Sequence, residues 1–249
     1  MSRSKQFLNI LGTQTLIDYT IERIATFTSK DNIWILGNSE QDSELDRLSS
    51  VPKDQILREP FGRNTAACIG WGAFEVFKKD PEATLVIVPA DAWIEPNEAF
   101  TETIEKGIHA AKETNSVITI GIQPTSAHTG YGYIETVKSA QTVLQVSSFK
   151  EKPDKSMAES YLSKGTYYWN AGIFIVQAKK LMDLFNRHMP THYELLKHIS
   201  DQQLRDSQEI APFYEELETI SIDYGIMEKI SDDIKLVANI GLELDANKE

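Results

Sequence analysis

The stretch Thr84-Leu85-Val86-Ile87-Val88-Pro89-Ala90-Asp91 decides the fold that we expect for this chain. It is a short, continuous apolar run closed by a proline, which is typical of a strand covered on both faces in a parallel sheet. In open α/β sheets, ligands bind beyond the carboxyl ends of such strands. We therefore predict a parallel strand that ends at Pro89 and places Asp91 at a binding crevice.

The sequence on both sides of this strand alternates between helical and extended patterns. Apolar residues recur at helical spacing before and after it, and further short apolar runs predict neighbouring strands. The expected helices span 16–27, 65–79 and 97–113, and the expected strands span 32–36 and 116–121. Strand, helix, strand, helix, strand is the order of a doubly wound, Rossmann-like sheet.

The pattern changes after Gly121, where apolar and polar residues alternate as they do in antiparallel strands. This half of the chain predicts strands over 133–137, 143–149 and 172–176, a short helix over 157–163, and mostly helical structure over 178–218. With 249 residues and 41% hydrophobic content, the chain is long enough for one principal domain. We predict a single α/β domain over residues 1–249, with a mixed sheet flanked by helices.

The net charge of −12 argues against a nucleic acid or an anionic membrane as partner, because their phosphate groups repel an acidic protein. A small phosphorylated ligand needs only a few well-placed cations and backbone N–H groups, so it stays compatible with this charge. The single cysteine, Cys68, offers no intramolecular disulfide, and no apolar run is long enough to span a bilayer. We expect a soluble protein of the reducing cytoplasm.

Polar residues stand at the predicted crevice and before the helix that starts near residue 65. A carboxylate at Asp91 would hold a divalent cation that bridges phosphate oxygens, or it would cap the turn that follows the strand. The run Glu59-Pro60-Phe61-Gly62-Arg63-Asn64-Thr65-Ala66 carries donors for a base or a phosphate. The alternative for this run is a surface turn followed by a helix cap at Asn64 or Thr65.

Further stretches in the second half combine glycine, charged and amide residues. Gly130-Tyr131-Gly132-Tyr133 would let the backbone approach a ligand beside an aromatic wall, and Glu151-Lys152 would bind sugar hydroxyls and a phosphate. Asn170 can both donate to and accept from a pair of sugar hydroxyls. The segment 221–229 mixes polar and apolar residues in a helix-like pattern. Taken singly, these stretches are also explained by a strand-edge turn, a solvated ion pair or capped core packing.

Taken together and in order, these stretches resemble the mannose-1-phosphate guanylyltransferases of the sugar nucleotidyltransferase family. The resemblance runs from Lys5 to Lys229 and rests on Lys-Gln-Phe-Leu, Glu-Pro-Phe-Gly-Arg-Asn-Thr-Ala, Pro-Ala-Asp, Thr-Gly-Tyr-Gly-Tyr-Ile-Glu, Glu-Lys-Pro-Asp, Trp-Asn-Ala-Gly-Ile-Phe and Ser-Ile-Asp-Tyr-Gly-Ile-Met-Glu-Lys. It implies a GT-A-like nucleotidyltransferase fold. It also implies transfer of GMP from GTP to mannose 1-phosphate, with Mg²⁺ as cofactor, to give GDP-mannose and pyrophosphate.

The resemblance implies roles for individual residues. Lys5 would meet the triphosphate and Asp91 would hold the metal, which makes them the expected catalytic residues. The expected nucleotide-binding residues are Glu59, Pro60, Arg63, Asn64 and Thr65, and the expected substrate-binding residues are Tyr131, Gly132, Glu151, Lys152 and Asn170. Residues 1–125 would form the nucleotide side, and residues 126–249 the sugar side.

The sequence departs from the family pattern in three places. The family opens with a strand and a Gly-Gly-x-Gly-x-Arg-Leu-x-Pro loop before the lysine motif, and neither precedes Lys5 here, so we expect a sheet that lacks its first strand. Ala92 stands where the family usually has histidine. Asp245 is an out-of-register substitute for the second aspartate that binds metal in the family.

These departures leave three hypotheses open. The chain is an active guanylyltransferase, or a catalytically silent or fragmentary relative that binds a sugar nucleotide, or a transferase for another base or hexose phosphate. An unpaired sheet edge favours pairing with another chain, so we expect either a homo-oligomer or pairing with a complete subunit.

Overall fold

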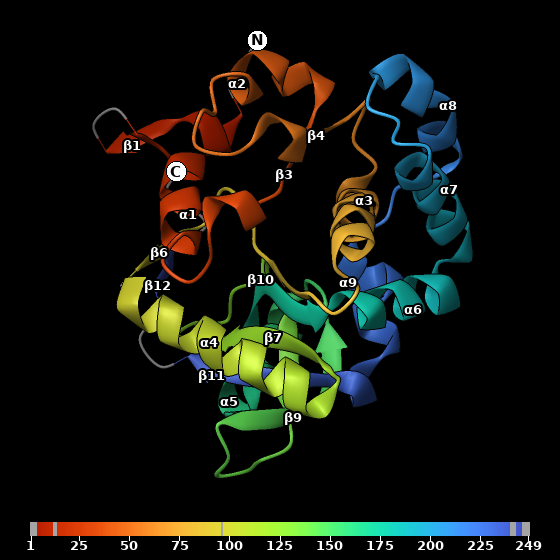
Figure 1. The fold of residues 1–249 in the computed structure, drawn as a ribbon. Helices are drawn as coiled ribbons and strands as arrows, with labels where there is room; N and C mark the ends of the chain where they lie inside the picture. The colour runs from red at the N-terminus through yellow and green to blue at the C-terminus, as the bar shows by residue number, and fades with distance from the viewer. Residues whose placement is uncertain (1–3, 12–13, 96, 240–242, 246–249) are drawn as a thin grey trace.

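A mixed sheet of six strands forms the centre of the fold (Figure 1). The computed structural model describes residues 4–11, 14–95, 97–239 and 243–245. β7 and β11 are parallel, and the other pairs of this sheet are antiparallel. β8 also pairs with the start of β10, so the sheet curls back on itself. The strands lie in the order β5 (Thr84–Ile87), β10 (Tyr167–Gln177), β7 (Val117–Ile122), β11 (Ile234–Asn239), β9 (Val143–Lys150) and β8 (Tyr133–Thr136).

The strand expected over residues 84–89 is shorter and paired differently from the prediction. β5 ends at Ile87, pairs antiparallel with β10 and is the end strand of the six-stranded sheet. The prediction of a parallel strand covered on both sides is therefore wrong for the described pairings. Among the described strands only β10 lies beside β5, and this position leaves most of its residues half-buried.

A parallel pairing that the sequence did not predict occurs in a separate, two-stranded sheet. β3 (Ile35–Asn38) and β4 (Ile56–Glu59) pair in parallel, with Asn38 opposite Glu59 at their carboxyl ends. α1 (Leu16–Ile24) and α2 (Asp42–Leu45) share a hydrophobic cluster with these strands. α1 begins where predicted because Thr15 and Asp18 form a capping box, but it ends three residues before the expected Phe27.

Short elements complete the framework. Two pairs of short antiparallel strands are β1 (Asn9–Leu11) with β2 (Gln14–Thr15), and β6 (Trp93–Glu95) with β12 (Glu243–Asp245). The short 3₁₀ helices are η1 (Lys5–Phe7), η2 (Lys30–Asn32), η3 (Ser39–Gln41), η4 (Lys53–Gln55), η5 (Met227–Lys229) and η6 (Ser231–Asp233).

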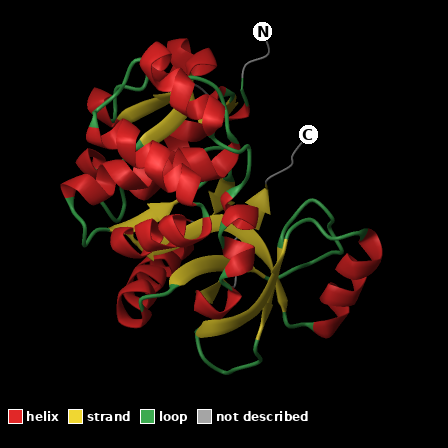
Figure 2. Cartoon of the chain, turned by 90° about the vertical axis from the view of Figure 1, so that its right-hand side faces the viewer, coloured by secondary structure: helices red, strands yellow, loops and turns green. Residues whose placement is uncertain are grey.

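Longer helices cover the strands and form a second layer (Figures 1 and 2). α4 (Asn97–Thr114) packs across β10, β7 and β11. α3 packs against α6 and α7, and α8 packs on α7. Among the described residues, none of the helices combines the length and the apolar character that a bilayer crossing needs. The remaining helices are α3 (Asn64–Lys79), α5 (Lys155–Lys164), α6 (Ala178–His188), α7 (Pro190–Asp201), α8 (Ser207–Glu216) and α9 (Ile222–Gly225).

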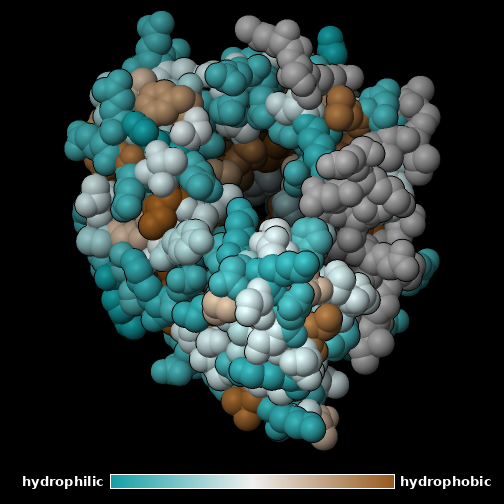
Figure 3. Space-filling view, turned by 180° about the vertical axis from the view of Figure 1, so that it is seen from behind, coloured by the Kyte–Doolittle hydropathy of each residue, from teal (hydrophilic) through white to brown (hydrophobic). Residues whose placement is uncertain are grey.

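The largest hydrophobic cluster joins α3, α6, α7 and α8 to one face of the sheet. Trp71 on α3 is completely buried in it. Gly70 brings α3 close to α7, because a Cβ at this position would lie 2.7 Å from Leu196. The face of the molecule seen from behind is hollowed near its centre, with apolar side chains in the depth of the hollow (Figure 3).

β10 contains an irregularity at the residues predicted to bind sugar. Asn170 lies opposite Gly121 of β7, whereas Phe174 lies opposite Thr119, so β10 carries two extra residues between these pairs. Gly172 makes this bulge with a φ of 69°, a left-handed conformation that glycine adopts without strain. Asn170 is the last residue of β10 that pairs with β7 before the bulge, and such a bulge bends the strand and changes the direction of nearby side chains.

Replacing Gly172 with alanine tests the bulge. Nothing lies within 4 Å of a Cβ built on Gly172, so the cost of Gly172→Ala comes from the positive φ alone. We expect a loss of roughly 1–2 kcal/mol in the free energy of unfolding, measured with urea. Gly165→Ala is the matched control, since Gly165 ends α5 with a φ of 68° and equal open space. Equal losses are expected for both variants, and an unchanged stability of Gly172→Ala would contradict the strained turn.

Candidate active site

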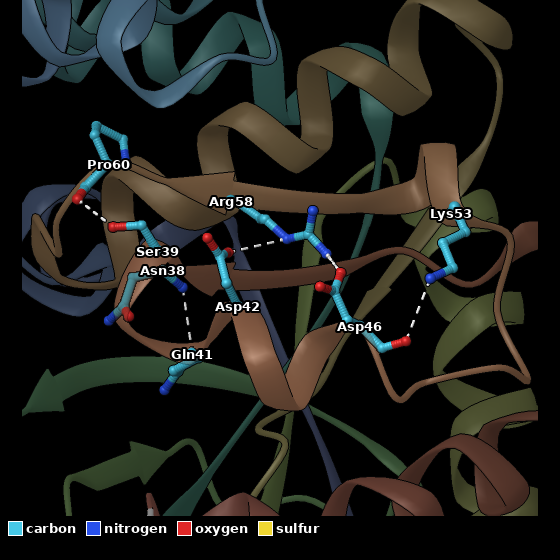
Figure 4. Close-up of polar contacts among 8 residues, drawn as sticks. All are labelled: Asn38, Ser39, Gln41, Asp42, Asp46, Lys53, Arg58 and Pro60. Carbon is cyan, nitrogen blue, oxygen red and sulfur yellow. Dashed lines mark hydrogen bonds and ion pairs between the residues drawn. The ribbon is translucent and has the colours of Figure 1, made fainter. Parts of the chain in front are cut away.

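Ion pairs and hydrogen bonds brace the β3–β4 unit at the predicted nucleotide side (Figure 4). The guanidinium of Arg58 bridges two carboxylates of the α2 region, at 3.2 Å from Asp42 and 2.6 Å from Asp46. The Ser39 hydroxyl donates to the carbonyl oxygen of Pro60 at 2.8 Å. These contacts hold the end of β4 in place, and they engage the Pro60 carbonyl within the protein.

Glu59, the last residue of β4, points to the opposite face from Arg58, because successive side chains alternate along a strand. Its side chain is buried near Cys68 and Tyr214, and among the described residues its Oε1 has no hydrogen-bond partner. Burial raises the pKa of Glu59 to about 8, although the Tyr214 hydroxyl lowers it in part. At neutral pH this carboxyl group is therefore mostly protonated and neutral.

Arg63 anchors the end of α8 in this structure. Its Nε donates to the carbonyl oxygen of Tyr214 at 2.7 Å, and its Nη2 donates to that of Glu215 at 3.1 Å. A third donor, Nη1, reaches the Thr219 hydroxyl at 3.2 Å. A cation that binds the last carbonyls of a helix stabilises its negative end, so Arg63 has a clear structural task. Its nucleotide contact stays a prediction.

Asn64 and Thr65 form the start of α3, but neither is its N-cap. The N-cap is Arg63, without a side-chain capping bond, so the expected cap at Asn64 or Thr65 is wrong. Asn64 adopts a φ of 64°, and its Oδ1 accepts from the backbone N–H of Thr65. The Thr65 hydroxyl instead accepts from the backbone N–H of Ile222 at 3.0 Å. Thr65 therefore connects the nucleotide side to the segment 221–229.

Lys5 and Asp91 are attached to the same small core. Phe7 of η1 belongs to the hydrophobic cluster of α1, β3 and β4, and Ala90 packs against that cluster. The side chains of Lys5 and Asp91 are exposed at its surface. Both predicted catalytic residues therefore lie next to the hydrophobic cluster of α1, β3 and β4, with Asp91 in a turn just beyond β5.

The predicted metal ligands agree only in part with what the structure describes. A single exposed carboxylate such as Asp91 fits Mg²⁺, which often takes one or two protein carboxylates together with substrate phosphates. The backbone of Asp245 pairs opposite Trp93, two residues from Asp91, while its side chain lies outside the described part of the structure. No group of three or more His, Cys, Asp or Glu residues suited to a metal occurs among the described residues.

Three of the predicted sugar-side residues converge on one point of the sheet. The backbone N–H of Asn170 donates to the carbonyl oxygen of Gly132 at 2.8 Å. A Cβ built on Gly132 would lie only 2.5 Å from Oε2 of Glu151 and 3.4 Å from the Asn170 side chain. The Glu151 carboxylate thus occupies the space that a side chain at position 132 would take, so such a side chain would displace the carboxylate.

Aromatic rings line the same region. The ring centroid of Tyr131 lies 4.9 Å from that of Trp169 and 4.5 Å from that of His128. The indole Nε1 of Trp169 is buried and has no hydrogen-bond partner among the described residues. This cluster agrees with the aromatic wall predicted beside Gly132. The sequence had indicated only Tyr131 as a member of that wall.

Two acidic residues that the sequence analysis did not select complete the sugar side. Asn170 donates from Nδ2 to the Asp223 carboxylate at 3.1 Å, and Glu228 accepts from the backbone N–H of Glu151 at 3.3 Å. Both belong to the segment 221–229, which the sequence had indicated as a capped, helix-like stretch. Ser221 caps α9 and Ile222 is buried, so that part of the interpretation is confirmed.

The carboxyl groups of this cluster influence one another. Burial raises the pKa of Glu151, and the charges of Asp223 and Glu228 raise it further, while Lys152 lowers it. Burial also raises the pKa of Asp223, against the lowering effect of the Asn170 hydrogen bond. Such shifts from burial and like charges are common at functional sites.

Lys152 adopts an unusual backbone conformation beside Glu151. Its φ is 45°, a left-handed value that is uncommon for a residue other than glycine, asparagine or aspartate. Its ammonium group is 3.9 Å from Oε1 of Glu151 and is mostly exposed to solvent. An exposed ion pair of this kind contributes little stability, so it does not by itself account for the strained conformation.

A family model for nucleotidyl transferases matches residues 1–214 of this sequence. The chain belongs to the nucleotidyl transferase family. In this nucleotidyl transferase, the matched residues include the β3–β4 unit, the turn with Asp91, and the residues Gly132, Glu151 and Asn170 of the sugar side.

Similar proteins carry names that involve a mannose phosphate. A Klebsiella pneumoniae protein named mannose-1-phosphate guanylyltransferase is 32% identical over 254 residues, covering 97% of this chain and 52% of that protein. A Thermus thermophilus structure, described as mannose-1-phosphate geranyltransferase, has a TM-score of 0.86 and 29% identity, covering 97% of this chain and 69% of that one. A Helicobacter pylori structure, described as mannose-6-phosphate isomerase, has a TM-score of 0.81 and 26% identity, covering 96% and 95%. This nucleotidyl transferase chain spans about half the length of the curated relatives it matches.

The buried Glu59 predicts a specific dependence of stability on pH. Because its pKa rises from 4.5 to about 8 on folding, the folded state holds this proton more tightly than the unfolded chain does. The resulting stability is fully present below pH 4.5 and is lost as the pH rises to about 8. Glu59→Gln removes this titration, so its free energy of unfolding should decline less than that of the wild type over the same interval.

Urea unfolding of both proteins at several pH values across that interval measures the difference. Glu159→Gln, at an exposed position of α5, is the control and should keep the wild-type slope. A Glu59→Gln slope equal to that of the wild type would show that Glu59 ionises normally in the folded protein.

Proposed function

We propose that this chain transfers GMP from GTP to mannose 1-phosphate, forming GDP-mannose and releasing pyrophosphate. The observation that carries the proposal is the convergence of Gly132, Glu151 and Asn170 on one point of the sheet. Family membership supports nucleotidyl transfer as the reaction, and the names of three similar proteins share a mannose phosphate. Together these observations favour an active transferase over a silent relative.

The reaction makes and breaks one bond at phosphorus. A phosphate oxygen of mannose 1-phosphate forms a bond to the α-phosphorus of GTP, while the bond from that phosphorus to the β-bridging oxygen breaks and pyrophosphate leaves. The protein's contribution to such an in-line displacement is mainly positioning and charge stabilisation. We assign the hydroxyl groups of the hexose to Glu151 and Asn170, the sugar phosphate to Lys152, and the triphosphate to Lys5.

Asp91 is the residue that we assign to Mg²⁺. Its exposed position after β5 would let the carboxylate share the ion with phosphate oxygens, whose charge Mg²⁺ neutralises when it is bound. The nucleotide base would lie on the side of Glu59, Pro60 and residues 63–65, where β4 ends and α3 begins. Tyr131 and Trp169 would close the sugar side with their rings.

Pyrophosphate release from GTP and mannose 1-phosphate, measured with and without Mg²⁺, tests the proposal directly. We expect turnover that needs the metal and falls by at least about 100-fold in Asp91→Ala, because the substrate charges lose their bridging ion. Asp183→Ala, at an exposed position of α6, is the control and should keep wild-type turnover. A folded wild type without turnover would favour the silent relative, and turnover only with another nucleotide or hexose phosphate would reassign the substrates.

The sugar side is tested separately by Gly132→Ala. A Cβ at this position forces the Glu151 carboxylate away from its place beside Asn170, since the new Cβ and Oε2 of Glu151 would otherwise stand 2.5 Å apart. We expect the KM for mannose 1-phosphate to rise by roughly 10-fold, corresponding to one weakened hydrogen bond to a charged group, while the KM for GTP stays unchanged. Steady-state kinetics with each substrate varied in turn provide the measurement. A rise in both KM values would place Gly132 outside the sugar pocket.

A further inference from the structure

The amide of Asn170 is held in one orientation by three partners. Its Oδ1 accepts from the backbone N–H of Gly172 at 3.0 Å and from the hydroxyl of Thr119 at 3.3 Å. Its Nδ2 donates to the Asp223 carboxylate at 3.1 Å. A backbone N–H can only donate, so the oxygen must face Gly172 and the nitrogen must face Asp223.

This arrangement determines what Asn170 offers to a ligand. Both lone pairs of Oδ1 are engaged, and one of the two N–H bonds goes to Asp223. The second N–H has no acceptor among the described residues, so the amide presents a single donor. Glu151, 15% exposed beside Gly132, presents carboxylate oxygens that only accept when ionised.

A sugar hydroxyl suits this pair of groups, because it can accept from Asn170 and donate to Glu151 at the same time. Reversal of the amide would replace the donor with an acceptor, leaving the amide oxygen and the carboxylate to compete for the single proton of the hydroxyl. The orientation of Asn170 therefore decides whether the hydroxyl is bound or rejected, as expected where a site pairs each polar group of its substrate.

We propose that Asp223 is the positioning residue for hexose recognition, and that it acts by fixing the amide of Asn170. The proposal rests on the proposed function for the identity of the hexose phosphate. It goes beyond that function because Asp223 would control the recognition of the hexose without contacting the ligand itself. Asp223 is suited to this task because α9 is tied to α3 through Ile222 and Thr65, so its carboxylate approaches Asn170 from a fixed support.

The segment that carries Asp223 also reaches the second group of the pocket. Glu228, at the end of the same segment, accepts from the backbone N–H of Glu151 at 3.3 Å. The two hydroxyl-binding residues thus lie on β10 and just beyond β9, and both are positioned by one short stretch of chain. A change at Asp223 or Glu228 would therefore alter the hydroxyl-binding groups of the sugar side.

A double-mutant cycle tests whether Asp223 acts through Asn170. We expect Asp223→Ala to raise the KM for mannose 1-phosphate by roughly 10- to 100-fold, the range for a lost hydrogen bond to a charged group, with the KM for GTP unchanged. Asp223→Ala combined with Asn170→Ala should be no worse than Asn170→Ala alone, since the positioned amide is already gone. Asp223→Asn keeps an acceptor for the Asn170 N–H and should restore most of the affinity.

The results that would overturn the proposal are equally defined. Losses that multiply in the double variant would show that Asp223 acts independently of Asn170. A rise of both KM values in Asp223→Ala, together with a lower free energy of unfolding, would show a merely structural role.

A second measurement needs no catalysis, so it separates this proposal from the proposed function. The side-chain amide signals of Asn170 in a ¹⁵N-labelled protein are identified by their loss in Asn170→Ala. We expect them to shift in Asp223→Ala and to stay near their original position in Asp223→Asn. Unchanged signals in Asp223→Ala would overturn the positioning role, whatever the enzyme assay shows. Absent turnover in a wild type whose signals respond to Asp223→Ala would instead count against the proposed function alone.

Discussion

The bulge of β10 between Asn170 and Phe174 is the constraint on which the sugar side depends. β10 pairs with β8 and β7 before the bulge and with β7 and β5 after it, so it is the strand that holds the curled sheet together. In a regular strand the pleat alone would set the direction of the Asn170 side chain. Gly172 allows the chain to turn with a positive φ, and its N–H then binds the Asn170 side chain. Asn170 and Gly172 thus determine both the shape of the backbone here and the hydrogen-bonding groups that the Asn170 side chain presents.

The segment from Ile220 to Lys229 connects the sugar side to the start of α3. At one end, the backbone of Ala66 donates to the carbonyl oxygen of Ile220 and the Thr65 hydroxyl accepts from Ile222. At the other end, Asp223 and Glu228 reach Asn170 and the backbone of Glu151. One hydrogen-bonded segment therefore connects the start of α3 with Asn170 of β10 and with Glu151. A transferase requires such a connection, because the two substrates must meet with their reacting atoms close and aligned.

Much of the fold could be predicted from local patterns, whereas long-range pairings could not. The helix at 97–114 and the alternating strands near 133–136 and 143–150 follow from periodicity that a short window contains. The pairing partner of β5 could not be predicted in this way, because an apolar run has the same pattern whether the neighbouring strand is parallel or antiparallel. Gly132, Glu151 and Asn170 could be selected by their resemblance to a family. Asp223 and Glu228 were missed because their part depends on how the segment 221–229 docks onto the sheet. Arg63 looked like a ligand donor, although its acceptors lie about 150 positions away in the chain.

Under the proposed function, an acidic protein with three carboxyl groups at its sugar side would have to admit a phosphorylated ligand. Burial raises the pKa of both Glu151 and Asp223, and the charge of Glu228 adds to the effect on each of them. Lys152 opposes this effect, because its cation lowers the pKa of both carboxyl groups, and its ammonium group is mostly exposed to solvent. The hydroxyl groups of the proposed ligand would need acceptors such as Glu151, and its phosphate would need a cation such as Lys152. In the proposed function, the adjacent opposite charges of Glu151 and Lys152 would let two neighbouring residues bind the two ends of one small ligand.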